Sequence, residues 1–197
     1  MSRRKKSELL DLIADMVKAR AAHPPVDEET LTAAEEPLVR ALRKVGLKVS
    51  SVWDLVNNKD TYPAAVPILL DHLRKPYHRR IQEGIARSLA VPGARIGWGQ
   101  LLHHYNSIHD VDPGRDVNEL KWSLHLALAA AADKSVLDEL IHLACDRRHG
   151  GHRSMFVDAL ARIRGVRAQA ALAELRGDPD LKDAFERLDK KLKKRRR

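Results

Sequence analysis

Aromatic residues are scarce in this chain, and so are the β-branched residues that strands favour. Aromatic side chains make up 4% of the sequence, with three tryptophans, three tyrosines and two phenylalanines. Because aromatic and β-branched residues are enriched in strands, their scarcity argues against a β-rich fold. Ala, Leu, Arg, Lys, Glu and Asp fill most of the chain instead, and this composition predicts an all-α protein.

Cysteine and long apolar runs are also nearly missing. The single cysteine, Cys145, excludes an internal disulfide and fits a reducing compartment, so we expect a cytoplasmic protein. No apolar run approaches the length of a membrane span, and we expect no membrane partner. The stretch SELLDLIADMVKARAA at 7–22 contains Asp11 and Asp15, so we interpret it as an amphipathic helix and not as a signal peptide.

Positive charge is abundant, but it lies at the two ends of the chain. Residues 1–6 hold four basic residues and residues 190–197 hold seven, with no acidic residue in either segment. Because these eleven charges exceed the net charge of +9, residues 7–189 carry a net charge of −2. We therefore expect any nucleic-acid binding by the tails to be weak and independent of sequence.

Pairs of apolar helical stripes recur along the chain, and proline or glycine separates the two members of most pairs. The first pair contains Leu69 and Leu73 before Lys75-Pro76, and Ile81 and Ile85 after it. Later pairs are split by DRRHGG at 146–151 and by GDP at 177–179, and a looser pair surrounds the loop HDVDPGRD at 109–116. This pattern predicts four helix hairpins, each with one buried face per helix and with Leu89, Leu128, Leu160 and Leu188 at matching positions.

Two further helices are predicted ahead of these hairpins. Thr32 and Glu35 fit a capping box for a helix over 33–45. The stretch SSVWDLVNN at 50–58 fits a short helix with Trp53 and Val56 turned inward. We divide the chain into an N-terminal helical cap with a basic leader at 1–59, a repeat array at 60–193 and a basic tail at 194–197.

Three segments resemble the helices of HEAT-like repeats. AVPILLDHL at 65–73 resembles the first-helix pattern with its internal proline, and LKWSLHLAL at 120–128 and HRSMFVDALARI at 152–163 resemble the second. Lys121 and Arg153 stand at the usual basic position, whereas Gln82 and Leu181 depart from it. The chain is thus similar to the short bacterial HEAT-like family, which includes the bilin-lyase-type repeats. The resemblance implies a right-handed α-solenoid of about four hairpins.

The stretch DRRHGGHR at 146–153 admits two interpretations. With His142 and Cys145, its histidines are of the types that bind zinc. The spacing is not that of a paired structural zinc site, however. Cys145 also continues the stripe of Ile141 and Ala144, which predicts a buried structural thiol. We favour a turn between two helices, with Arg147 and Arg148 in the last helical turn and Gly150 in the left-handed cap position, and we expect no metal or other cofactor.

Second helices of HEAT-like arrays line a concave face, which is the best place to seek a binding site. On this register the residues that project there are Glu83, Arg87, Trp122, Leu126, Asp158, Arg162 and Glu186. Trp122 is either an exposed binding anchor or a packing residue against the neighbouring helix.

No G-x-S-x-G, P-loop or H-E-x-x-H motif is present, so the sequence favours a non-catalytic module that binds another protein: an adaptor, a regulator or an immunity-type inhibitor. A nucleic-acid-binding protein is the alternative. Some alkylpurine DNA glycosylases are built from HEAT-like repeats, and Trp122, Asp158 and Arg162 are of suitable types. That alternative requires a concave face that is positive without the tails. A relative of the bilin lyases is a third option, although no residue marks a chromophore site.

Overall fold

Ten α-helices and four short 3₁₀ helices make up the described part of the chain. The computed structural model describes residues 27–56, 58, 60–108 and 115–195. The α-helices are α2 (Glu28–Lys44), α3 (Trp53–Val56), α4 (Ala65–Leu73), α5 (Arg79–Ser88), α6 (Trp98–Ser107), α7 (Arg115–Ala131), α8 (Leu137–Cys145), α9 (Ser154–Leu160), α10 (Val166–Leu175) and α11 (Lys182–Arg195). The 3₁₀ helices are η1 (Pro92–Gly97), η2 (Lys134–Val136), η3 (Arg147–Arg153) and η4 (Pro179–Leu181). These residues include no β-strand, which confirms the all-α prediction.

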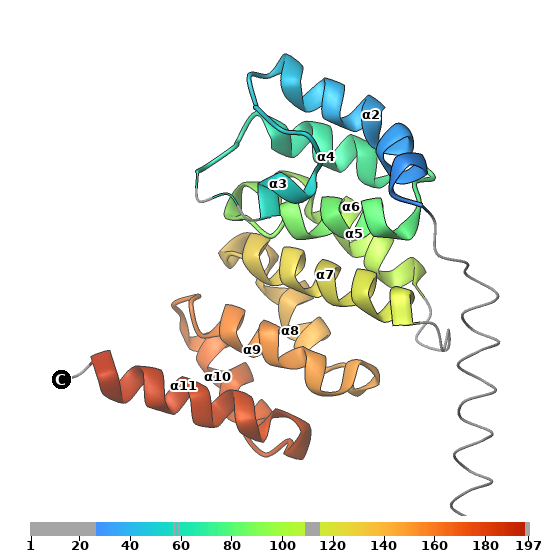
Figure 1. The fold of residues 1–197 in the computed structure, drawn as a ribbon. Helices are drawn as coiled ribbons and strands as arrows, with labels where there is room; N and C mark the ends of the chain where they lie inside the picture. Colours follow the sequence, from blue (N-terminus) through green and yellow to red (C-terminus); the bar gives the residue numbers. More distant parts are fainter. Residues whose placement is uncertain (1–26, 57, 59, 109–114, 196–197) are drawn as a thin grey trace, which may run out of the picture.

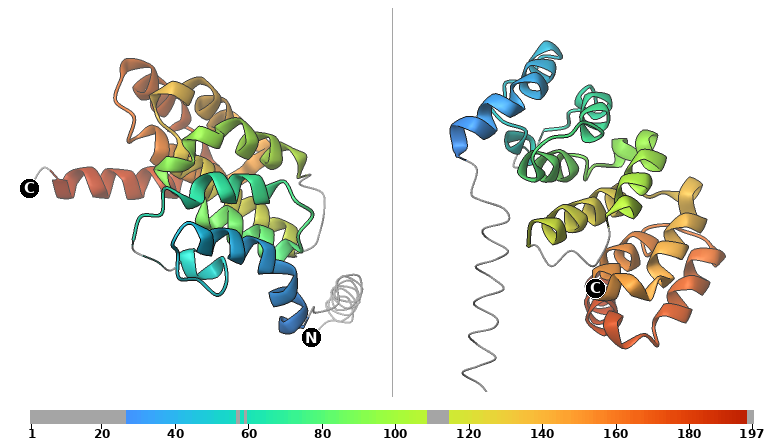
Figure 2. Two further views of the ribbon diagram at one scale, coloured as in Figure 1. Left: turned by 90° about the horizontal axis from the view of Figure 1, so that it is seen from above. Right: turned by 90° about the vertical axis from the view of Figure 1, so that its right-hand side faces the viewer.

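The helices stack in chain order, as Figure 1 shows from α2 at one end to α11 at the other. One layer is a continuous series in which α3 packs on α5, α5 on α7, α7 on α9 and α9 on α11. In the other layer α2 packs on α4, α4 on η1, and α8 on α10. In the right-hand view of Figure 2, turned by 90° about the vertical axis, α2 and α11 again lie at opposite ends.

Aspartates begin several of the short helices. The carboxylates of Asp133, Asp146 and Asp178 accept a hydrogen bond from the backbone N–H two residues later, at 2.8, 3.1 and 3.1 Å. Each thereby satisfies a donor at the start of η2, η3 or η4. These turns reverse the chain between the two layers.

A single cluster of buried residues runs through the stack from Leu38 to Leu188. The leucines that recur in the sequence pattern, Leu89, Leu128, Leu160 and Leu188, all belong to it. Three of the four residues at the basic position of the repeat pattern, all but Leu181, also share a role. Gln82, Lys121 and Arg153 each donate to a carbonyl of the turn before their helix, at 3.4, 3.1 and 2.9 Å.

Helix α2 starts at Glu28, earlier than the helix predicted over 33–45, and the capping-box prediction is wrong. Asp27 caps α2 by accepting from Thr30 N at 2.8 Å, because its short carboxylate reaches the exposed N–H groups of the first turn. Thr32 lies inside the helix. Glu35 is 6% exposed and instead accepts from Val52 N at 2.6 Å, which ties α2 to the start of α3.

DRRHGGHR does form the turn between α8 and α9, but two details of the prediction are wrong. Arg147 and Arg148 lie in η3 beyond the end of α8, and Gly150 takes its φ of +50° within this segment and not at a helix cap. The prediction that Cys145 is a buried thiol is also wrong. Cys145 is exposed, because the buried face of α8 runs through Leu140, Leu143 and Ala144 and leaves the last residue outside it.

The predicted helix at 7–22 and most of the loop HDVDPGRD lie outside the described residues. Within the described part, no helix is both long enough and apolar enough to cross a membrane.

Candidate functional site

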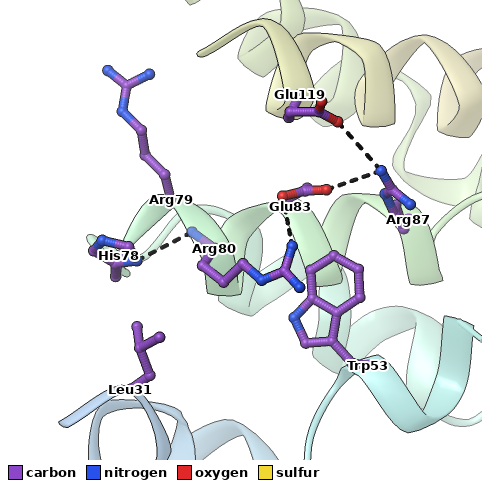
Figure 3. A pocket seen from close by; sticks show the side chains of 8 residues that line it. All are labelled: Leu31, Trp53, His78, Arg79, Arg80, Glu83, Arg87 and Glu119. Carbon is purple, nitrogen blue, oxygen red and sulfur yellow. Dashed lines mark hydrogen bonds and ion pairs between the residues drawn. The ribbon is translucent and has the colours of Figure 1, made fainter. Parts of the chain in front are cut away.

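A groove of about 600 Å³ opens on the layer formed by α3, α5 and α7. Its lining residues are Leu31, Trp53, His78, Arg79, Arg80, Glu83, Arg87 and Glu119. A second hollow adjoins it across Arg87 and Glu119 and adds Trp122 and His152. We call these ten residues the tryptophan–arginine groove. Figure 3 shows the side chains of the larger part.

One end of the groove is built around Trp53. The Arg80 guanidinium stacks on the indole, with its carbon 4.0 Å from the ring centroid. Its Nη1 also contacts Glu83 Oε2 at 3.4 Å. In Figure 3 the guanidinium lies between the carboxylate and the ring. A cation held over an indole face and against a carboxylate has few orientations, so Arg80 is presented in a defined geometry.

Arg87 joins the two parts of the groove. Its Nη2 contacts Glu83 Oε1 at 3.0 Å and Glu119 Oε2 at 3.5 Å, so it connects α5 to α7. Its guanidinium carbon also lies 4.9 Å from the ring centroid of Trp122. Glu83 is the buried centre of the network, at 7% exposed, and it holds both arginines. Burial of this carboxylate is tolerated because two guanidinium groups surround it.

Trp53 reaches the groove because α3 and α5 approach closely at Gly84. A Cβ at this position would lie 2.5 Å from Val52 Cγ1 and 2.9 Å from Trp53 Nε1. The absence of a side chain therefore lets the indole lie against α5. Trp53 and Val56, which are predicted to turn inward, are only partly buried. Val52 and Leu55 fill the core, and the indole packs against it at the groove. Only this crossing of helices reveals Trp53 as a site residue.

The structure brings three of the seven predicted binding residues together: Glu83, Arg87 and Trp122. The other four lie elsewhere, since none of them lines the groove. Leu126 is half-buried on α7, and Glu186 is exposed on α11. Asp158 accepts a contact of 3.1 Å from Lys191, and Arg162 donates to the carbonyl of Ala129. Asp158 and Arg162 thus connect neighbouring helices of one layer.

A histidine and tyrosine cluster lies beneath the His152 end of the groove. His125 is 1% exposed, and its ring nitrogens contact the Tyr105 hydroxyl and the Lys121 carbonyl, both at 2.9 Å. The rings of His149 and His152 lie 5.8 and 5.5 Å from that of His125. Burial lowers the pKa of His125 to about 4, so the ring is neutral near neutral pH.

The side chains considered for zinc do not converge. His142 and Cys145 are exposed, whereas His149 packs edge-on against Tyr105 at 5.1 Å between ring centroids. No group of three or more His, Cys, Asp or Glu residues in the described ranges is arranged to hold a metal ion. The pKa of the Cys145 thiol is raised, mainly by partial burial.

Comparisons with protein-family models, with curated proteins and with solved structures found no match for this chain. The class that the fold defines is an all-α stack of helices with a polar groove on one layer. The HEAT-like resemblance stays a prediction.

Proposed function

We propose that this chain is a non-catalytic HEAT-like repeat module that binds another protein through the tryptophan–arginine groove. Support for a repeat array comes from the continuous series α3, α5, α7, α9 and α11, together with the equivalent bonds of Gln82, Lys121 and Arg153. The right-handed solenoid is what the HEAT-like resemblance implies. In such arrays the series of second helices forms the binding surface.

The groove itself carries the proposal. Tryptophan and arginine are the residue types most enriched at the energetic centres of protein interfaces. Here two half-buried indoles and two oriented guanidinium groups lie side by side on α3, α5 and α7. The carboxylates of Glu83 and Glu119 both contact Arg87 and hold its guanidinium in place. A fixed guanidinium group suits a binding surface.

The test is an affinity pull-down from a lysate of the source organism, run with and without nuclease. Trp122→Ala should lose the captured partner, since it removes an indole wall of the groove. Arg167→Gln on α10 is the matched control, because Arg167 pairs with Asp138 outside the groove and is 68% exposed. Capture that is equally strong with both variants contradicts the proposal.

Nucleic acid is the second candidate, and the stacking of Arg80 and Arg87 on tryptophans favours it, since aromatic and basic groups alternate in many single-strand binding sites. Glu83 and Glu119 oppose it, because they place negative charge in the same groove. Loss of capture on nuclease treatment is the outcome that selects this candidate.

A further inference from the structure

We infer that the partner segment that enters the tryptophan–arginine groove is acidic and presents carboxylate side chains to Arg80 and Arg87. This inference rests on the proposed function and specifies the partner's chemistry. It follows from the way the groove presents its cations, from their spacing and from the charge of the surrounding layer.

The Arg80 guanidinium packs on Trp53 but stays accessible to a ligand. The indole of Trp53 supports its flat face, and its contact with Glu83 uses Nη1 at the long distance of 3.4 Å. The side chain is nevertheless 57% exposed and lines the groove, so a ligand in the groove can reach it. A guanidinium fixed in this way matches the two oxygens of a carboxylate and loses little freedom on binding.

Arg87 is the second cation, and its distance from Arg80 sets the spacing of the ligand. Both guanidinium groups lie over the Trp53 ring, with carbons 4.0 and 5.5 Å from its centroid, and both contact Glu83, so their ends converge. Residues two positions apart in an extended peptide face the same side and lie about 7 Å apart, so two carboxylates in this arrangement match both arginines. The next side chains on the same face of the peptide then lie near Trp53 and Trp122, and we expect apolar residues there.

The carboxylates of the groove favour a peptide over a nucleic acid. Glu119 is 44% exposed at the junction of the two hollows. A peptide can place an uncharged residue beside this carboxylate, whereas a phosphate backbone carries a charge at every nucleotide and repels it. The peptide is therefore the ligand class that suits both signs of charge.

The layer is positively charged at its α11 end, which attracts an acidic partner. Lys190, Lys193 and Lys194 are exposed there, at the end of the same series of helices. They belong to the basic C-terminal segment, whereas residues 7–189 carry a net charge of −2. Charges of this kind raise the rate at which an oppositely charged partner arrives, while the groove provides the specific contacts.

The experiment selects peptides of about twelve residues, long enough to span the groove, from a random phage-displayed library on the full chain. Clones are counter-selected against Arg80→Gln, which keeps the 3.0 Å contact between Arg87 and Glu83 and so preserves the buried network. We expect enrichment of Asp or Glu at two positions two apart, with an apolar residue two positions before or after the pair.

Two variants then move the affinity of a selected peptide in opposite directions. Arg80→Gln should weaken binding by about tenfold, and Glu119→Gln should strengthen it by about twofold to fivefold, because a nearby negative charge is removed. Arg167→Gln should leave it unchanged. Replacing the peptide's Glu residues by Gln should reproduce the loss seen with Arg80→Gln.

Three outcomes overturn the inference. The first is that the selection yields no clone whose binding depends on the groove. The second is that the selected peptides contain no carboxylates. The third is that a fluorescein-labelled single-stranded DNA binds the chain and loses this binding with Arg80→Gln. If Trp122→Ala abolishes partner capture while the selected peptides lack acidic residues, the proposed function stands and this inference fails.

Discussion

Arg153 is the residue on which the junction between the last hairpins depends. Its side chain is fully buried, and its guanidinium contacts Asp178 at 2.9 Å and Asp180 at 3.2 Å. It also donates to the carbonyls of Gly150 and Ala144, so all parts of the guanidinium are used. One buried side chain thus connects the end of α8, η3 and η4.

We expect Arg153→Ala to lower the free energy of unfolding by about 3–5 kcal/mol, because it leaves buried carbonyls without their donor and leaves the buried Asp178 with only the exposed Arg147. Urea titration followed by circular dichroism measures this. Arg147→Ala is the matched control, since Arg147 pairs with the same Asp178 at 3.5 Å but is 78% exposed. Its loss should cost less than about 1 kcal/mol. Equal effects of the two variants contradict this account of Arg153.

His125 predicts how stability depends on pH. The folded protein holds this ring neutral with a pKa of about 4, whereas the unfolded chain has the ordinary value of 6.5. Below 6.5 the unfolded state therefore binds the extra proton. Stability should fall as the pH is lowered from 6.5 to about 4, by about 3 kcal/mol from this group, and should lose nothing further from it below that range.

Urea midpoints measured across this pH range test the effect, with His125→Gln as the comparison. Glutamine offers both a donor and an acceptor for Tyr105 and the Lys121 carbonyl but does not titrate. Burial also lowers the pKa of His72 and His104, so the variant should keep a smaller pH dependence. An identical slope in both proteins shows that His125 is not responsible.

At the scale of the helix, the crossing of α3 and α5 decides whether the groove exists. Gly84→Ala places a methyl group 2.5 Å from Val52 Cγ1, so the two helices must separate or the side chains must shift. We expect a loss of about 1–3 kcal/mol in unfolding free energy and a changed tryptophan emission, because Trp53 must move.

Gly99→Ala on α6 is the control for this prediction. No atom lies within 4 Å of a Cβ at that position, and alanine favours a helix, so the change should be neutral or stabilise by up to about 1 kcal/mol. A Gly84→Ala protein as stable as Gly99→Ala, with unaltered emission, shows that the crossing tolerates a side chain.

At the scale of the whole molecule, the two charged ends and the groove make separate contributions to binding. We expect deletion of residues 1–6 and 193–197 to remove any weak binding to duplex DNA. Because tail contacts release counterions, the affinity of the full chain should fall steeply with salt. Fluorescence anisotropy in a salt titration measures both effects.

The C-terminal cut follows Leu192 because Lys191 pairs with Asp158 and Leu192 lines an apolar hollow with α10. Folding should be unchanged, and binding of selected acidic peptides should be kept within about threefold, since only the long-range attraction is reduced. If the trimmed chain binds duplex DNA tightly at physiological salt, nucleic acid becomes the better-supported ligand.

The sequence by itself determined the all-α class and the positions of most helices in chain order. These depend on local signals, namely the period of apolar residues and the prolines, glycines and aspartates that end helices. Leu89, Leu128, Leu160 and Leu188 were therefore placed in the core correctly. Glu83, Arg87 and Trp122 were selected because they lie off the buried stripes of second helices.

Tertiary structure alone decided which of these residues meet. Trp53 lines the groove because Gly84 allows α3 and α5 to pack closely. Asp158 and Arg162 lie outside the candidate site because they bond to neighbouring helices, through Lys191 and the Ala129 carbonyl. Glu35 ties α3 to α2 across sixteen or more positions of sequence, and Cys145 is exposed by the rotation of α8. Helical periodicity gives the buried face of one helix, but a contact between helices depends on their crossing and rotation, which no single stripe contains.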